Sequence, residues 1–134
     1  MAFMMGIVKA IMGRCETKEL GPGLWSLENG QVRVNLGQVT ELAAKGGAVY
    51  LQGKGLRTPV LIVRTEDDKY LAFANKCTHG GRKIDHVPGE SKLRCCSIGH
   101  STYDYDGNVI KGMAKRPIAK YESEVMGTDL IVKL

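Results

Sequence analysis

The pattern of apolar and polar positions along the chain predicts short β-strands joined by turns. Residues 31–36 alternate apolar and polar side chains, as a strand with one buried face does. Residues 59–64 and 70–75 are apolar runs on either side of a polar turn, which predicts a β-hairpin. Glycine-containing turns predict two more hairpins, over residues 103–110 and 121–134. The pattern therefore predicts an all-β domain, arranged as an antiparallel sandwich or a small barrel.

One helical segment interrupts this series of strands. Residues 41–45 are helix-forming and end at Gly46-Gly47, and residues 48–52 then resume a strand. The 134 residues, 17 of them glycine, have the size of a single domain and the composition of a turn-rich one. We expect that domain to span residues 31–134, after an N-terminal apolar segment and extension at residues 1–30.

The N-terminal segment raises the question of a membrane. Residues 1–13 are apolar apart from Lys9, but a transmembrane helix needs about 20 apolar residues. Lys9 lies inside the apolar run rather than before it, so the segment lacks the order of a secretory signal. We expect a cytoplasmic protein whose first residues form a short apolar helix. This helix would pack on the body or on a partner, including a second copy of the chain, with a membrane surface as the alternative.

The net charge limits the kinds of partner. The sequence has 19 Lys and Arg against 14 Asp and Glu, a formal charge of +5 that favours association with acidic surfaces. The basic residues are scattered and are not interleaved with aromatic residues. We therefore predict no nucleic-acid binding.

Cysteine and histidine residues gather in one window of the sequence. Cys77 and His79 form a C-x-H pair, and Cys95, Cys96 and His100 follow after a spacer. Side chains two residues apart leave an extended segment on the same side, so Cys77 and His79 can reach one metal centre. Thiolates and imidazoles suit either tetrahedral zinc or an iron–sulfur cluster, and the ligand types alone do not distinguish the two.

Three motifs resemble the Rieske [2Fe-2S] family, namely CTHGG at 77–81, CSIGHSTYD at 96–104 and GMAKRPI at 112–118. The resemblance covers roughly residues 31–134. It implies a Rieske-type antiparallel β-sandwich in which two loops form a cluster-binding subdomain at about residues 76–105. It also implies a [2Fe-2S] cluster as the cofactor, with Cys77, His79, Cys96 and His100 as the ligands.

The second motif departs from the family's C-x-x-H spacing. That spacing would need a histidine at position 98 or 99, and the sequence has His100 instead. Counting back from Tyr103 makes Cys96 the ligand, with the family's His-Gly written in reverse order. Counting forward from Leu93, the alternation of a strand makes Cys95 the ligand and leaves one extra residue before the histidine. We prefer Cys96 and keep Cys95 as the alternative.

Neighbouring side chains have roles that the resemblance also implies. Ser101 and Tyr103 occupy positions from which Rieske proteins of the quinol-oxidising type donate hydrogen bonds to the cluster's sulfur atoms. The additional disulfide of those proteins has no counterpart in the motifs, which makes the chain more similar to soluble Rieske ferredoxins. His86 lies between the two motifs, and we expect it to be a surface-loop histidine.

The resemblance implies a function in electron transfer. We expect a one-electron carrier, either a ferredoxin or the small subunit of a larger oxidoreductase, that performs no bond chemistry itself. Its redox partner would dock through an acidic surface, because the basic residues border the motifs. The competing hypothesis is a structural zinc module, in which the same four ligands close a tetrahedral site in an interaction scaffold.

Overall fold

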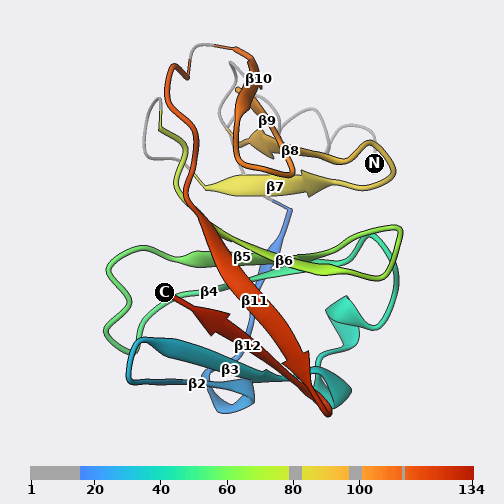
Figure 1. Ribbon diagram of the computed structural model, residues 1–134, viewed down its shortest axis with the longest axis vertical. Helices are drawn as coiled ribbons and strands as arrows, with labels where there is room; N and C mark the ends of the chain where they lie inside the picture. Colours follow the sequence, from blue (N-terminus) through green and yellow to red (C-terminus); the bar gives the residue numbers. More distant parts are fainter. Residues whose placement is uncertain (1–15, 79–82, 97–100, 113) are drawn as a thin grey trace, which may run out of the picture.

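The computed structural model describes residues 16–78, 83–96, 101–112 and 114–134, which form two β-sheets (Figure 1). The larger sheet has eight strands in the order β1-β4-β5-β6-β11-β12-β3-β2, and the smaller has four in the order β10-β9-β8-β7. Within this part of the chain the only helices are short 3₁₀ helices. The prediction of an all-β protein is therefore confirmed.

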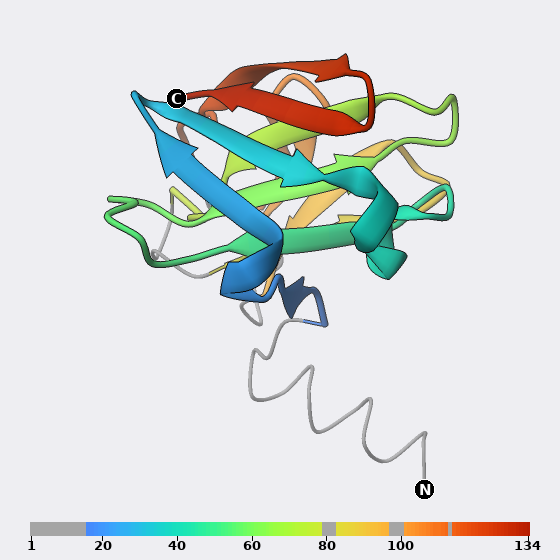
Figure 2. The same ribbon diagram turned by 90° about the horizontal axis from the view of Figure 1, so that it is seen from below.

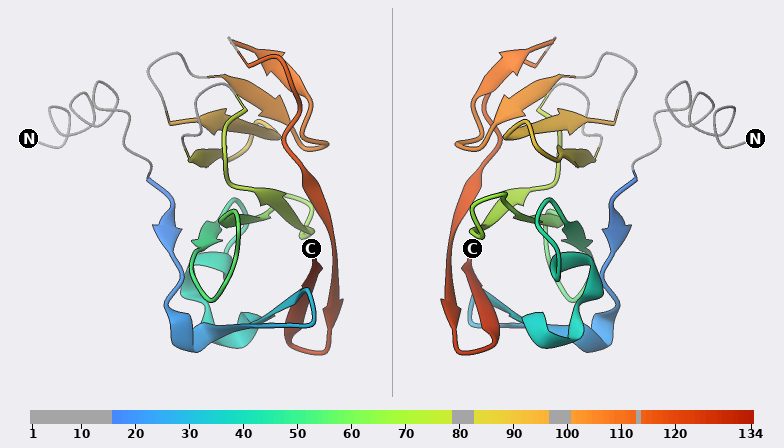
Figure 3. Two further views of the ribbon diagram at one scale, coloured as in Figure 1. Left: turned by 90° about the vertical axis from the view of Figure 1, so that its left-hand side faces the viewer. Right: turned by 90° about the vertical axis from the view of Figure 1, so that its right-hand side faces the viewer.

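The larger sheet curls around its own core, as the two side views in Figure 3 show. Three 3₁₀ helices lie between its strands: η1 (Pro22–Leu24), η2 (Leu36–Gln38) and η3 (Thr40–Leu42). Its strands are β1 (Lys18–Glu19), β2 (Trp25–Glu28), β3 (Gln31–Asn35), β4 (Ala48–Leu51), β5 (Val60–Arg64), β6 (Tyr70–Ala74), β11 (Lys120–Met126) and β12 (Asp129–Lys133).

The smaller sheet packs against one end of the larger one, at the top of Figure 1. Its strands are β7 (Ile84–Val87), β8 (Lys92–Cys95), β9 (Thr102–Asp104) and β10 (Val109–Lys111). Because β8 pairs with both β7 and β9, the segments that carry the two cysteine-containing motifs are held side by side. We call this unit the cluster sheet.

Strand β5 separates two hydrophobic cores. Val60 and Ile62 face the core inside the curled sheet, whereas Leu61 and Val63 face the second core, which lies under the cluster sheet. A strand buried on both faces needs a continuous apolar run rather than an alternating one, which explains the sequence of β5. Phe73 of β6 also belongs to the second core, so the cluster sheet packs against the β5–β6 hairpin of the large sheet.

The predicted elements agree with the structure where they depend on local sequence. The hairpins β5–β6, β9–β10 and β11–β12 all form as antiparallel pairs. The helix expected at residues 41–45 is the 3₁₀ helix η3, which begins and ends earlier. The strands β1 and β2 pair with β4 and β3, so the large sheet includes residues before 31.

The expectation of a surface-loop histidine at position 86 was wrong. His86 lies in β7 and is 9% exposed, with its ring turned toward the interior. The sequence of β7, IDHV, does not read as a strand, because a polar side chain occupies one of its two buried positions. Its partners come from distant parts of the chain and are described below.

The described part of the chain begins just before β1, the dark blue strand at the bottom of Figure 2, and its first residues contact the cluster sheet. The Asp85 carboxylate of β7 accepts hydrogen bonds from the Glu16 and Thr17 amides, both at 2.9 Å, and from Thr17 Oγ1 at 2.6 Å. The apolar residues 1–13, with the helix expected there, lie outside the described residues. Among the described residues no helix has the length and hydropathy of a membrane span.

Candidate metal centre

The described cysteines lie where the two sheets meet. Cys77 follows β6 of the large sheet, Cys95 is the last residue of β8, and Cys96 comes next. All three side chains are buried, with exposed fractions of 1%, 1% and 7%. The other two predicted ligands, His79 and His100, lie outside the described residues.

Tyr103 of β9 lies against the first cysteine. Its hydroxyl oxygen is 3.2 Å from the Cys77 Sγ and accepts a hydrogen bond from the Thr78 amide at 3.2 Å. Thr78 Oγ1 donates to the Arg116 carbonyl at 2.6 Å, because a carbonyl can only accept. The Tyr103 proton is therefore directed to the Cys77 sulfur or to Thr78 Oγ1, which is also 3.2 Å away.

The protonation state of Tyr103 suits a donor. Burial raises the pKa of this phenol, and the hydrogen bond to Cys77 raises it further, whereas the bonds from Thr78 act in the opposite direction. The hydroxyl therefore keeps its proton at neutral pH. A thiolate that binds iron has no proton, so in a hydrogen bond between them the phenol would donate and the Cys77 sulfur would accept.

Ser101 connects the second motif to the loop that carries the third motif, residues 112–118. Its side chain is 1% exposed, and its Oγ accepts a hydrogen bond from the Ala114 amide at 3.1 Å. The loop approaches Ser101 so closely that a Cβ on Gly112 would lie 2.5 Å from the Ser101 Cα. Gly112 has φ +99°, so this position favours glycine for two independent reasons.

Cys95 and Cys96 have different surroundings. The side chain of Cys95 belongs to the second core, together with those of Cys77 and Tyr103, and its amide donates to the Ser101 carbonyl at 2.7 Å. The Cys96 amide donates to the Lys83 carbonyl at 3.0 Å. Cys96 is disulfide-bonded. Iron binds a thiolate, so ligation by Cys96 requires this disulfide to be reduced to two thiols.

Asn75, two residues before Cys77, links the two ends of the first motif's loop. The sequence analysis did not predict this role. Its Oδ1 accepts a hydrogen bond from the Ile84 amide at 2.6 Å, which joins the chain before Cys77 to the start of β7. The side chain is 2% exposed, yet its Nδ2 has no hydrogen-bond partner among the described residues. A buried unpaired donor costs about 1–3 kcal/mol, so a group that accepts hydrogen bonds would be stabilised here.

The donor set and its surroundings fit an iron–sulfur cluster. The two motifs supply buried cysteine sulfur, the Tyr103 hydroxyl lies against one of these sulfurs, and Asn75 adds an unpaired buried donor nearby. Donors directed at sulfur stabilise the extra negative charge that a cluster acquires on reduction. A zinc site would also use thiolates, but hydrogen-bond donors around its sulfurs serve no redox step.

Positive side chains surround this end of the molecule. Residues 69–84 and 107–121 contain no Asp or Glu. Beside the first and third motifs, five described basic residues form no ion pair with another described residue: Lys76, Lys83, Lys111, Lys115 and Arg116. All except Lys83 are exposed; the Lys83 ammonium lies 5.3 Å from the centre of the Tyr50 ring. We call these five residues the basic rim.

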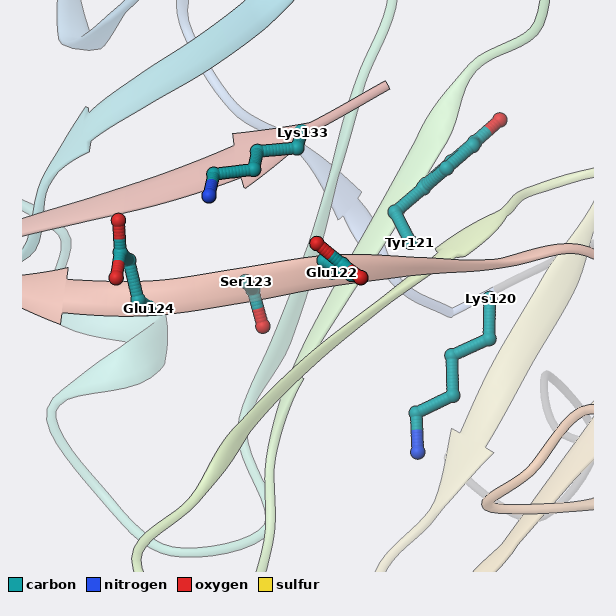
Figure 4. Close-up of a pocket in the computed structure, with 6 residues that line it drawn as sticks. All are labelled: Lys120, Tyr121, Glu122, Ser123, Glu124 and Lys133. Carbon is teal, nitrogen blue, oxygen red and sulfur yellow. The ribbon is translucent and has the colours of Figure 1, made fainter.

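A hollow of about 460 Å³ lies on the large sheet rather than between the motifs (Figure 4). Its lining comes from β11 and β12, and consists of Lys120, Tyr121, Glu122, Ser123, Glu124 and Lys133. Ser123 donates its hydroxyl to the Tyr70 carbonyl at 3.0 Å. The lining contains neither cysteine nor histidine, so the hollow is separate from the candidate metal centre.

Comparisons with known proteins assign the fold to a family. The sequence profile described as Rieske [2Fe-2S] domain matches residues 32–122. The chain therefore belongs to the Rieske [2Fe-2S] domain family, whose members hold a [2Fe-2S] cluster and transfer electrons through it. None of the curated proteins compared with the chain matches it.

Solved structures of Rieske proteins resemble this one. The plasma membrane Rieske protein PetC3 of the cyanobacterium Synechocystis is 27% identical, with a TM-score of 0.53 over 63% of this chain and 86% of that one. The ferredoxin of carbazole 1,9a-dioxygenase from Nocardioides aromaticivorans is 23% identical, with a TM-score of 0.61 over 75% of this chain and 92% of that one. A quaternary ammonium Rieske monooxygenase is 17% identical, with a TM-score of 0.54, and the similarity covers 69% of this chain and 28% of that one.

Proposed function

We propose that this Rieske domain works as a one-electron carrier, either as a ferredoxin or as the small subunit of a larger oxidoreductase. The observation that carries the proposal is the buried Cys77 sulfur of the CTHGG motif, which lies 3.2 Å from the Tyr103 hydroxyl. The cluster would be held by Cys77, His79 and His100, together with Cys96 or Cys95. The reaction that makes or breaks bonds belongs to the partner.

Ligation by two cysteines and two histidines determines which redox partners are suitable. Two ferric ions, two sulfides, two thiolates and two neutral imidazoles sum to zero formal charge, whereas a cluster with four thiolates is a dianion. Adding an electron to the neutral centre is easier, and Rieske potentials accordingly lie at about −150 to +300 mV. The bound cluster supplies one-electron chemistry in this range, so moderate reductants suffice.

The surroundings of the carrier are part of the proposal. The basic rim supports docking on an acidic surface of the redox partner. The apolar residues 1–13 support a contact with that partner or with a second copy of the chain. The position of Lys9 within the apolar run supports a cytoplasmic location.

The composition of the purified protein tests the function. We expect about two iron and two acid-labile sulfide per chain, a coloured oxidised form, and an electron paramagnetic resonance signal after one-electron reduction. Metal analysis and the spectrum of the reduced protein measure these directly. One zinc per chain, without iron or sulfide, would contradict electron transfer and support the scaffold hypothesis.

Serine substitutions distinguish the two candidate cysteines. With Cys96 as the ligand, Cys96→Ser abolishes the cluster, whereas Cys95→Ser keeps the iron and sulfide content near that of the wild type. The reverse result assigns the ligand to Cys95. Non-reducing and reducing peptide mass spectra of the same samples show whether the disulfide at Cys96 is present in the protein that carries the cluster.

Removing the Tyr103 hydroxyl should lower the reduction potential. The hydrogen bond stabilises the reduced state more than the oxidised one, and a bond worth about 0.5–1.5 kcal/mol corresponds to roughly tens of millivolts for one electron. Protein-film voltammetry of Tyr103→Phe measures the shift. Tyr121→Phe is the matched control, because Tyr121 lies on the large sheet at the hollow of Figure 4. A potential equal to the wild type in Tyr103→Phe would show that this hydroxyl does not tune the centre.

Charge reversal in the basic rim should change the rate of electron transfer to charged oxidants. Oxidation by anionic ferricyanide should slow in Lys115→Glu, and oxidation by cationic hexaamminecobalt should speed up, because steering depends on the sign of the local charge. Both effects should weaken as salt rises, since the Debye length is about 8 Å at physiological ionic strength. Lys133→Glu on β12 is the control. Equal effects of the two substitutions would mean that electrons leave the protein away from the rim.

A further inference from the structure

His86 forms hydrogen bonds to both sheets through its two ring nitrogens. Its Nδ1 lies 2.9 Å from the Gly46 carbonyl, and its Nε2 lies 2.6 Å from the Tyr105 hydroxyl. A carbonyl only accepts, so Nδ1 carries the proton and Nε2 of the neutral ring accepts from Tyr105. Burial lowers the pKa of His86, and the bond to Gly46 and the charge of Glu66 oppose this only in part. The ring is therefore neutral at pH 7, as this arrangement requires.

Gly46 lies just before β4 and is hydrogen-bonded to β5 of the large sheet. Its amide donates to the Arg64 carbonyl at 2.9 Å, and the Arg64 amide donates to the Gly47 carbonyl at 2.9 Å. The backbone has φ +84° there, and a Cβ on Gly46 would lie 3.0 Å from the Pro88 Cβ in the turn after β7. The two sheets thus approach each other closely at the point where His86 joins them.

Tyr105, the residue after β9, links His86 to the cluster sheet. Burial and the charges of Glu66 and Asp67 raise the pKa of its phenol, and a hydrogen bond with Ser91 acts in the opposite direction. The phenol therefore stays protonated and donates to His86. The two rings are also in contact, with their centroids 5.8 Å apart.

Tyr103 and Tyr105 share one core. Tyr103 is fully buried in the second core, and Tyr105 packs against the same cluster of side chains two residues further on. The Tyr103 hydroxyl lies against the Cys77 sulfur, whereas the Tyr105 hydroxyl is bonded to His86. One short segment is thus held at two points, by the first motif and by the histidine that joins the sheets.

We propose that His86 and Tyr105 are positioning residues, which hold β9 so that the Tyr103 hydroxyl stays against the Cys77 sulfur. The inference rests on the proposed electron-transfer function. It adds that the reduction potential depends on two side chains whose hydrogen bonds go to each other and to the Gly46 carbonyl. Pairing with β8 and β10 holds the strand itself. Loss of either contact frees its end at Tyr105, and the Tyr103–Cys77 hydrogen bond becomes longer or less populated.

Reduction potentials of the protein with its cluster test this inference. Tyr105→Phe removes only the hydroxyl, and His86→Asn keeps a donor for Gly46 but loses the acceptor for Tyr105. Both should lower the potential, by less than Tyr103→Phe does, and Tyr121→Phe should leave it unchanged. In the Tyr103→Phe background, Tyr105→Phe should have no further effect, because the bond that it positions is already gone.

Two results would overturn the proposal. The first is a potential equal to the wild type in both Tyr105→Phe and His86→Asn, whatever their stability. The second is a shift of the same size in the presence and absence of the Tyr103 hydroxyl. Should Tyr105→Phe lose the cluster, His86→Asn alone makes the comparison, and an unchanged potential there counts against the proposal.

Failure of the proposed function gives a different result. If the wild-type protein contains no iron and sulfide, the proposed function is contradicted. The position of Tyr103 can then still be tested through the reactivity of the Cys77 thiol. The rate of Cys77 alkylation, followed by peptide mass spectrometry, should then fall in Tyr103→Phe and also in Tyr105→Phe, because the phenol donor stabilises the reactive thiolate. A fall in Tyr103→Phe alone would show that Tyr105 does not position β9.

Discussion

The pairing of β8 with both of its neighbours is the constraint on which the site depends. Ile84 lies opposite Cys95, and Leu93 lies opposite Tyr103, so the register of three strands determines which side chains meet under the ligand motifs. Side chains alternate between the faces of a sheet, and a slip of one residue would turn Cys95 and Leu93 to the opposite face. The second core fixes this register, because Ile84, Leu93 and Tyr103 must all be buried at once.

The sequence predicts the parts of this structure that depend on neighbouring residues. The β5–β6 hairpin follows from two apolar runs and the turn between them, and the CTHGG motif is recognisable because its residues are contiguous. The hairpin β7–β8 is harder to predict, because IDHV and KLRC each place a polar or weakly apolar residue at a buried position. His86 can be buried only because Gly46, forty residues earlier, and Tyr105, nineteen residues later, satisfy its ring nitrogens.

The choice between Cys95 and Cys96 has the same physical origin. In β8 the strand alternation turns Leu93 and Cys95 inward and Arg94 outward, and Cys96 follows immediately after the strand ends. Alternation assigns an orientation only while the chain stays extended, so it applies to Cys95 and not to its neighbour. Spacing from Tyr103 favours Cys96, and burial beside Cys77 favours Cys95.

Charge connects the centre to its partner in the proposed carrier. The oxidised cluster with two neutral imidazoles has no formal charge, so the attraction for an acidic partner comes from the side chains of the basic rim. These same lysines and arginine favour the reduced state, because an added electron makes the centre negative. An acidic partner that docks on the rim offsets part of this positive potential and therefore lowers the affinity of the centre for its electron. By linkage the partner binds the oxidised protein more tightly than the reduced one. Docking on an acidic surface thus favours release of the electron to that partner, whereas a partner that delivers electrons gains nothing from the rim once the transfer is complete.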